Sequence, residues 1–111
     1  MIHRARRKQA KPKVLWSHLA RADLTRIGDY IAADNPRAAE QWVAKLIALV
    51  EKAAQVPMAG RVVPEFRRPD LRERILRHYR VVYRLQREGI EVVTIFEGHR
   101  RFPPDAAADE A

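Results

Sequence analysis

The sequence contains no cysteine, which excludes disulfide bonds and thiolate metal sites. It also lacks a long apolar run. The longest candidate, Ala44 to Val56, is interrupted by Lys45, Glu51 and Lys52, whereas a membrane helix needs roughly 18 apolar residues. The N-terminus MIHRARRKQAKPK has no apolar central region of a signal peptide. We therefore expect a protein of the reducing cytoplasm with no membrane partner.

Cofactor motifs are absent as well. The chain has no glycine-rich phosphate loop and no nucleophile elbow around Ser17. Its four histidines share no ligand spacing and no paired carboxylate accompanies them, so we expect neither a metal nor another cofactor.

Positive charge is abundant, with a net charge of +8 over 111 residues, a length typical of one domain. The charge is uneven: +6 for residues 1–13, zero for 14–59, +5 for 60–103 and −3 for 104–111. We interpret residues 1–13 as a basic flexible arm, 14–103 as the folded domain and 104–111 as an acidic flexible tail. Such a field suits an anionic partner, either a nucleic acid or an acidic protein.

Two helices are predicted in the first half of the chain. Ser17 is a suitable N-cap for a helix that begins near His18, and Asn35 with Pro36 is typical of the start of a second helix, which ends before Pro57. The short junction between them predicts an antiparallel hairpin. Each helix has one apolar stripe: Ala20, Leu24, Ile27 and Ile31 in the first; Ala39, Trp42, Val43, Leu46, Ile47, Val50, Ala53 and Ala54 in the second.

Strands are predicted at both ends of the domain. KVLWS has the composition of a short strand that joins a sheet edge, while residues 56–70 read as a loop. Three strands follow, at Arg72–Arg77, Tyr79–Leu85 and Ile90–Phe96, with Gly89 in the last hairpin turn. The predicted fold is α+β: an N-terminal strand, an antiparallel two-helix hairpin and a three-stranded antiparallel meander, with the helices on one sheet face.

The alternation of the central strand separates two faces. Ile75, Tyr79, Val81, Tyr83 and Leu85 are predicted to face the helices. The other face carries His78, Arg80, Val82 and Arg84, and two exposed arginines there would form a positive groove for phosphate or carboxylate groups. The alternative is a solvated face with cross-strand pairing of these arginines to Glu91 or Glu73.

The end of the last strand, IFEGHRRFP, offers a second candidate site. His99 beside Arg100 and Arg101 raises the option of RNA cleavage, since that reaction needs an acid, a base and cationic stabilisation of the phosphorane. The alternative is an interaction surface, with Phe102 packing back on the helices as an anchor. A plain nucleic-acid-binding module would also use the charge, but the arginine face carries no aromatic residue for stacking.

Four motifs in order, DLTRIGDYIAADNPRAAEQW, PMAGRVVPEF, YRVVYRL and FEGHRRFP, resemble the ParE branch of the ParE/RelE toxin superfamily over Val14 to Pro103. The resemblance implies the toxin of a type II toxin–antitoxin pair, silenced by a ParD-like antitoxin, that causes growth arrest by inhibiting DNA gyrase without cutting a bond. The related RelE-like branch, which cleaves mRNA on the ribosome, shares the fold and stays open as an alternative.

The resemblance also suggests roles for particular residues. We expect His99, Arg100, Arg101 and Phe102 to contact the target. We expect the antitoxin to lay an amphipathic helix over His78, Arg80, Val82 and Arg84, its acidic side chains pairing with the arginines. Under the nuclease alternative, the catalytic set would be His99, Arg80, Arg84 and Arg100.

Overall fold

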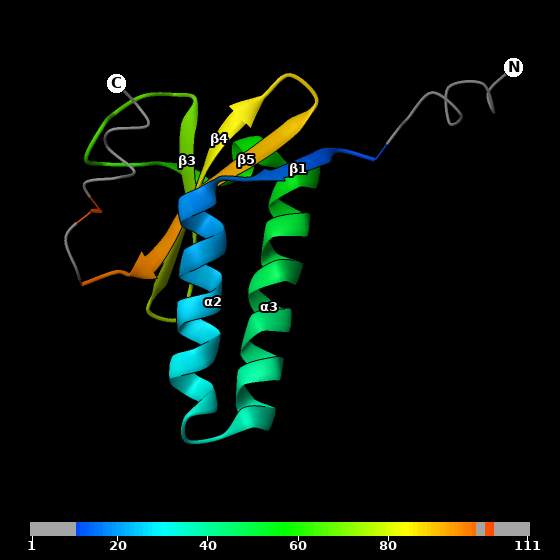
Figure 1. Ribbon diagram of the computed structural model, residues 1–111. Helices are drawn as coiled ribbons and strands as arrows, with labels where there is room; N and C mark the ends of the chain where they lie inside the picture. The colour runs from blue at the N-terminus through cyan, green and yellow to red at the C-terminus, as the bar shows by residue number, and fades with distance from the viewer. Residues whose placement is uncertain (1–10, 100–101, 104–111) are drawn as a thin grey trace, which may run out of the picture.

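A computed structural model describes residues 11–99 and 102–103 of the chain. Within them a helical hairpin lies against one face of a sheet (Figure 1). The elements in chain order are β1 (Lys13–Trp16), α2 (His18–Ala32), α3 (Pro36–Gln55), the 3-10 turn η1 (Pro57–Ala59), β2 (Arg61–Val62), β3 (Leu71–Leu76), β4 (Tyr79–Gln86) and β5 (Gly89–Glu97).

The sheet has five strands in the order β1-β5-β4-β3-β2. The antiparallel meander β3-β4-β5 and the N-terminal strand, which pairs in parallel with β5 at the sheet edge, confirm the predicted α+β fold. The two-residue strand β2 pairs with β3 and was not predicted, because two residues are too short to show a period.

Both helix starts are confirmed. The Ser17 hydroxyl accepts a hydrogen bond from the Ala20 N–H at 2.9 Å, and the Asn35 side chain accepts one from the Ala38 N–H at 3.1 Å, with Pro36 in the first turn. These bonds satisfy backbone donors that the helix itself leaves unpaired. Figure 1 shows the two helices side by side, as their short connection requires.

The main core lies between the helices and the sheet. Tyr79, Val81 and Tyr83 face the helices as predicted, but Ile75 does not, since it pairs with Arg80 and is 49% exposed. The β3–β4 turn consists of Arg77, with a φ of 57°, and His78, so odd positions of β3 lie beside even positions of β4. The buried residues of this core are Ala20, Leu46, Val50, Ala53, Ala54, Tyr79, Val81, Tyr83, Ile90, Val92 and Ile95.

The opposite sheet face, predicted to be open to solvent, carries a second small core. Val82 is fully buried there, because the loop between β2 and β3 and the chain after β5 cover it. Its members are Val63, Leu71, Val82, Val93 and Phe96, packed against Leu19, Phe66 and Phe102. An arginine on this face is therefore not automatically exposed.

One acidic residue of α2 forms hydrogen bonds with the edge of β5 that β1 leaves unpaired. β1 pairs with β5 only as far as Val92, so the edge beyond it has no neighbouring strand. Asp23, which is 2% exposed, supplies the acceptor that a neighbouring strand would otherwise provide. Its Oδ2 accepts hydrogen bonds from the Thr94 hydroxyl at 2.5 Å and the Ile95 N–H at 3.0 Å. This contact joins α2 to the strand that leads to the candidate site.

Gly89 was predicted in the hairpin turn, but the turn is formed by Arg87 and Glu88, and Gly89 is the first residue of β5. It pairs with Lys13 of β1, and a Cβ at this position would lie 1.8 Å from the Lys13 carbonyl oxygen. Glycine is required here by the close approach of β1, not by the turn.

Candidate functional site

The sequence had suggested that Arg80 lines a positive groove, but the structure places it elsewhere. Its side chain is 9% exposed; Nε donates to Glu73 Oε1 at 2.7 Å, and the two terminal nitrogens donate to the two Glu65 oxygens, each at 2.8 Å. The hydrogen bonds with Glu65 raise the pKa of Arg80 above its usual value, and the same bonds lower the pKa of Glu65. The prediction of an exposed guanidinium was wrong because two carboxylates enclose it.

Arg84 is also paired. Its Nη2 lies 3.0 Å from Glu91 Oε1 on the neighbouring strand, with the two side chains 23% and 26% exposed. The alternative drawn from the sequence, pairing of these arginines with Glu91 or Glu73, is therefore confirmed. Arg84 pairs with Glu91, and Arg80 pairs with Glu73. Of the four residues expected to meet the antitoxin, two are buried, Arg80 and Val82, and His78 is exposed.

His78 and His99 line one cleft of about 540 Å³, together with residues of α2, β4 and β5. His78 Nε2 lies 3.8 Å from Glu97 Oε2, and its ring packs on that of Tyr79 with centroids 4.3 Å apart. One wall of the cleft is the second half of α2. The other wall is formed by the start of β4 and the end of β5. Its lining residues are Arg26, Ile27, Tyr30, His78, Tyr79, Ile95, Phe96, Glu97 and His99.

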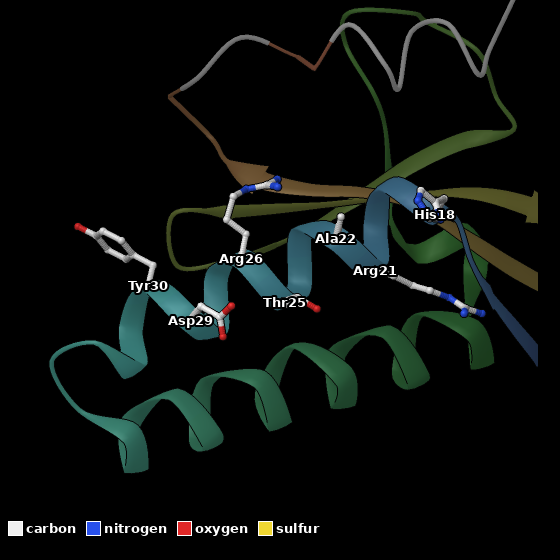
Figure 2. Close-up of a pocket in the computed structure, with 7 residues that line it drawn as sticks. All are labelled: His18, Arg21, Ala22, Thr25, Arg26, Asp29 and Tyr30. Atoms are coloured by element: carbon white, nitrogen blue, oxygen red, sulfur yellow. The ribbon is translucent and has the colours of Figure 1, made fainter.

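A shallower hollow runs along the outer face of α2 (Figure 2), lined by His18, Arg21, Ala22, Thr25, Arg26, Asp29 and Tyr30. Figure 2 shows Arg26 reaching towards β5 and Tyr30 pointing away from the body of the domain. Because Arg26 and Tyr30 also line the cleft, the two surfaces are continuous. Tyr30 is 81% exposed, the highest value among the exposed large apolar residues of the described part.

Sequence reasoning named no residue of α2 for this surface. A signal was present: Tyr30 lies off the apolar stripe of its helix, and an aromatic side chain outside the buried stripe has no packing role. Arg26 gave no such signal, because a charged residue on an outer helix face is ordinary.

Phe102 packs inward. Its ring centroid lies 5.0 Å from that of Phe66 and 5.3 Å from that of Phe96, both in edge-to-face geometry. It is an anchor, as one interpretation of the sequence proposed, but on the sheet face opposite the helical hairpin. Arg100 and Arg101, the other expected target contacts, lie outside the described residues.

Two further observations concern residues 11–99 and 102–103. They contain no group of three or more His, Asp or Glu side chains arranged to hold a metal ion. In the same part of the chain, neither helix combines the length and the apolar character needed to cross a membrane.

Comparison with known proteins identifies the class of fold and then the family. A chain of a structure titled as a chromosomal ParDE toxin–antitoxin system from P. aeruginosa superimposes with a TM-score of 0.64 at 24% identity, covering 78% of this chain and 96% of that one. This likeness establishes the fold. Y4kP, a candidate toxin of Sinorhizobium fredii, is 31% identical over 96 residues, which is 85% of this chain and 96% of the relative.

A protein-family model matches nearly the whole of the predicted folded domain. Residues 14–102 match the sequence model of the ParE toxin of type II toxin–antitoxin system, parDE. The chain therefore belongs to the ParE toxin family.

Proposed function

We propose that this ParE-family toxin inhibits DNA gyrase by protein–protein contact, makes and breaks no covalent bond, and is neutralised by a ParD-like antitoxin. The observation that carries the proposal is the pairing of Arg80 and Arg84 with Glu65, Glu73 and Glu91. These two arginines are two of the three cations in the catalytic set predicted for a cleavage reaction.

Cleavage through a ribose 2′-hydroxyl requires cations that are free to stabilise a developing phosphorane. The Arg80 guanidinium instead donates to three carboxylate oxygens, and phosphate would have to displace Glu65 to reach it. The arrangement therefore favours a binding protein over a nuclease.

A contact surface is available where the cleft opens. Arg26 and Tyr30 flank it from α2 and His99 from the end of β5, and Tyr and Arg are enriched among residues that dominate binding energy. Arg100 and Arg101, the other expected target contacts, follow His99 directly in the sequence. We assign the gyrase contact to the cleft rim and the chain that follows it.

The antitoxin would occupy the same cleft. His78, the exposed member of its predicted contact set, lies there beside an apolar floor that includes Ile27 and Ile95. An amphipathic helix with acidic residues along one edge could bury its apolar face on that floor and place its carboxylates near Arg26. Neutralisation then follows from occlusion, because one surface serves both partners.

One observation favours a second candidate, ribosome-dependent mRNA cleavage of the RelE type. The cleft brings His78, Glu97, His99 and Arg26 together, which supplies an acid, a base and a cation. This set differs from the one predicted from the sequence and shares only His99 with it.

Substituting both cleft histidines by glutamine separates the two candidates. Loss of general acid–base groups lowers a nuclease rate by about 10²–10⁴-fold for each group. Glutamine is neutral, polar and of similar size, so in a binding protein the contact that we assign to His99 is weakened and not lost. We therefore expect the double variant His78→Gln/His99→Gln to arrest growth at an inducer level within a few-fold of the parent's. Complete loss of arrest, with the variant still folded and still bound by antitoxin, would favour cleavage.

A further inference from the structure

Arg80 lies at the centre of a compact group of charged and aromatic side chains. We call Arg80, Glu65, Glu73, Phe96 and Phe102 the Arg80 cluster. The guanidinium carbon lies 5.1 Å from the ring centroid of Phe96 and 5.9 Å from that of Phe102, in addition to the ion pairs with both glutamates. Glu73 also accepts a hydrogen bond from Arg61, so both of its oxygens are used.

Stability alone is a poor explanation for this cluster. A buried ion pair contributes little net free energy compared with apolar residues of the same volume, because both charges lose their hydration. Glu73 is 1% exposed and Arg80 7%, so both groups bear this cost. The charges instead fix an orientation. A planar guanidinium held by two carboxylates presents its cationic face in one direction.

Arg80 lies beside the chain after β5 at two points, with its aliphatic stem near Gly98 and its guanidinium near Phe102. The Gly98 N–H donates to the His78 carbonyl oxygen at 2.6 Å, and a Cβ on Gly98 would lie 3.4 Å from Cγ and 3.5 Å from Cδ of Arg80. Four residues later, the Phe102 ring packs over the Arg80 guanidinium and against Phe66 and Phe96. Arg80 thus contacts the chain on both sides of His99.

We propose that Arg80 is a positioning residue: held by Glu65 and Glu73, it fixes Gly98 and Phe102 in place and so presents His99 to the target. This inference rests on the proposed function, which places a gyrase contact at His99. Arg80 itself touches no target.

The chain offers a selective spectroscopic probe of the cluster. It contains three phenylalanines, Phe66, Phe96 and Phe102, and all three pack together in the second core. Uniform labelling with 4-fluorophenylalanine therefore gives ¹⁹F resonances from this region alone. The parent protein should show three resonances dispersed by the neighbouring rings, each assigned by single Phe→Leu replacement.

The test variant is Arg80→Met/Glu73→Gln, which removes the cation together with its most buried carboxylate. We expect the Phe102 resonance to move towards the position of free fluorophenylalanine, with the far-UV circular dichroism unchanged. The concentration that half-inhibits gyrase supercoiling should rise by roughly tenfold, the effect of losing one cation–π contact and the order it imposes. Antitoxin binding through the cleft should change less than this.

A matched control is Arg68→Met/Asp70→Asn, since Arg68 Nη2 lies 2.7 Å from Asp70 Oδ2 in the loop that also carries Glu65. Removing this pair should leave the Phe102 resonance and gyrase inhibition unchanged. If the test variant unfolds, all three resonances collapse together, and Arg80→Lys replaces it. Lysine keeps the charge but lacks the planar fork, so the Phe102 resonance should still move in a folded protein.

Each outcome has a defined meaning. An unmoved Phe102 resonance in a folded variant overturns the positioning role, whatever the supercoiling assay shows. A displaced resonance with undiminished inhibition also overturns it, because the placement of Phe102 would then be irrelevant to the target. Failure of the parent protein to inhibit gyrase instead refutes the proposed function, while the ¹⁹F spectrum still decides whether Arg80 holds Phe102.

Discussion

Asp23 provides the sharpest test of how the fold supports the site. Replacing it by Ala leaves two buried donors, the Thr94 hydroxyl and the Ile95 N–H, without an acceptor. Thr94 is 0% exposed and Ile95 1%, so water does not replace the lost carboxylate. At about 1–3 kcal/mol for each unsatisfied buried donor, Asp23→Ala should lower the free energy of unfolding by about 2–6 kcal/mol. That is a large share of a typical domain's total of about 5–15 kcal/mol.

Urea unfolding followed by circular dichroism measures this loss. The ion pair of Asp23 with Arg26 adds little to it, because the Arg26 side chain is 67% exposed. Asp29→Ala, an exposed aspartate on the same helix, is the control and should change stability by less than about 0.5 kcal/mol. A second replacement supplies a sharper criterion: Thr94→Val in the Asp23→Ala background removes one orphaned donor and should recover about 1–3 kcal/mol.

A free energy of unfolding for Asp23→Ala within about 0.5 kcal/mol of the parent's would refute this reasoning. So would a double variant less stable than Asp23→Ala, since the hydroxyl would then not be the source of the cost.

Three further expectations concern other contacts. Gly89→Ala should separate β1 from β5, because the added Cβ overlaps the β1 backbone, and hydrogen exchange should show lost protection of the amides that join β1 to β5, with the β3 and β4 amides unchanged. The hydrogen bonds from Arg80 lower the pKa of Glu65, so its stabilisation is present above about pH 4.5 and is lost as the pH falls through the lowered pKa; the parent should therefore lose stability relative to Glu65→Gln in urea titrations over that acid range. Tyr83→Phe, which deletes a hydroxyl that donates to a backbone carbonyl oxygen at 2.6 Å, should lower the free energy of unfolding by about 0.5–1.5 kcal/mol; an unchanged urea midpoint would contradict this contact.

The sequence predicted the parts of this protein that depend on neighbours in the chain. Ser17 and Asn35 cap helices through bonds to backbone groups three residues away, so their roles are visible locally. The strand period likewise identified β4 and β5, and four motifs in order pointed to the family.

Contacts between distant residues were not predictable in the same way. Arg80 and Glu65 are separated by fifteen positions, and Asp23 and Thr94 by seventy-one, so no local pattern marks either pair. The alternation along β4 correctly separated its two faces, but it carried no information about what covers the second one. The prediction of an exposed arginine groove was therefore wrong because other parts of the chain cover that face. The surface that we propose in its place lies around His78, His99 and Tyr30.

The central claim is that this toxin acts by contact with gyrase. Purified protein added to DNA gyrase in supercoiling and DNA-cleavage assays, and in parallel to translating ribosomes with end-mapping of the mRNA, tests it directly. We predict loss of supercoiling at stoichiometric toxin, relieved by a ParD-like antitoxin, with intact mRNA. Cuts at defined codons of the mRNA, with gyrase activity untouched, would contradict the claim.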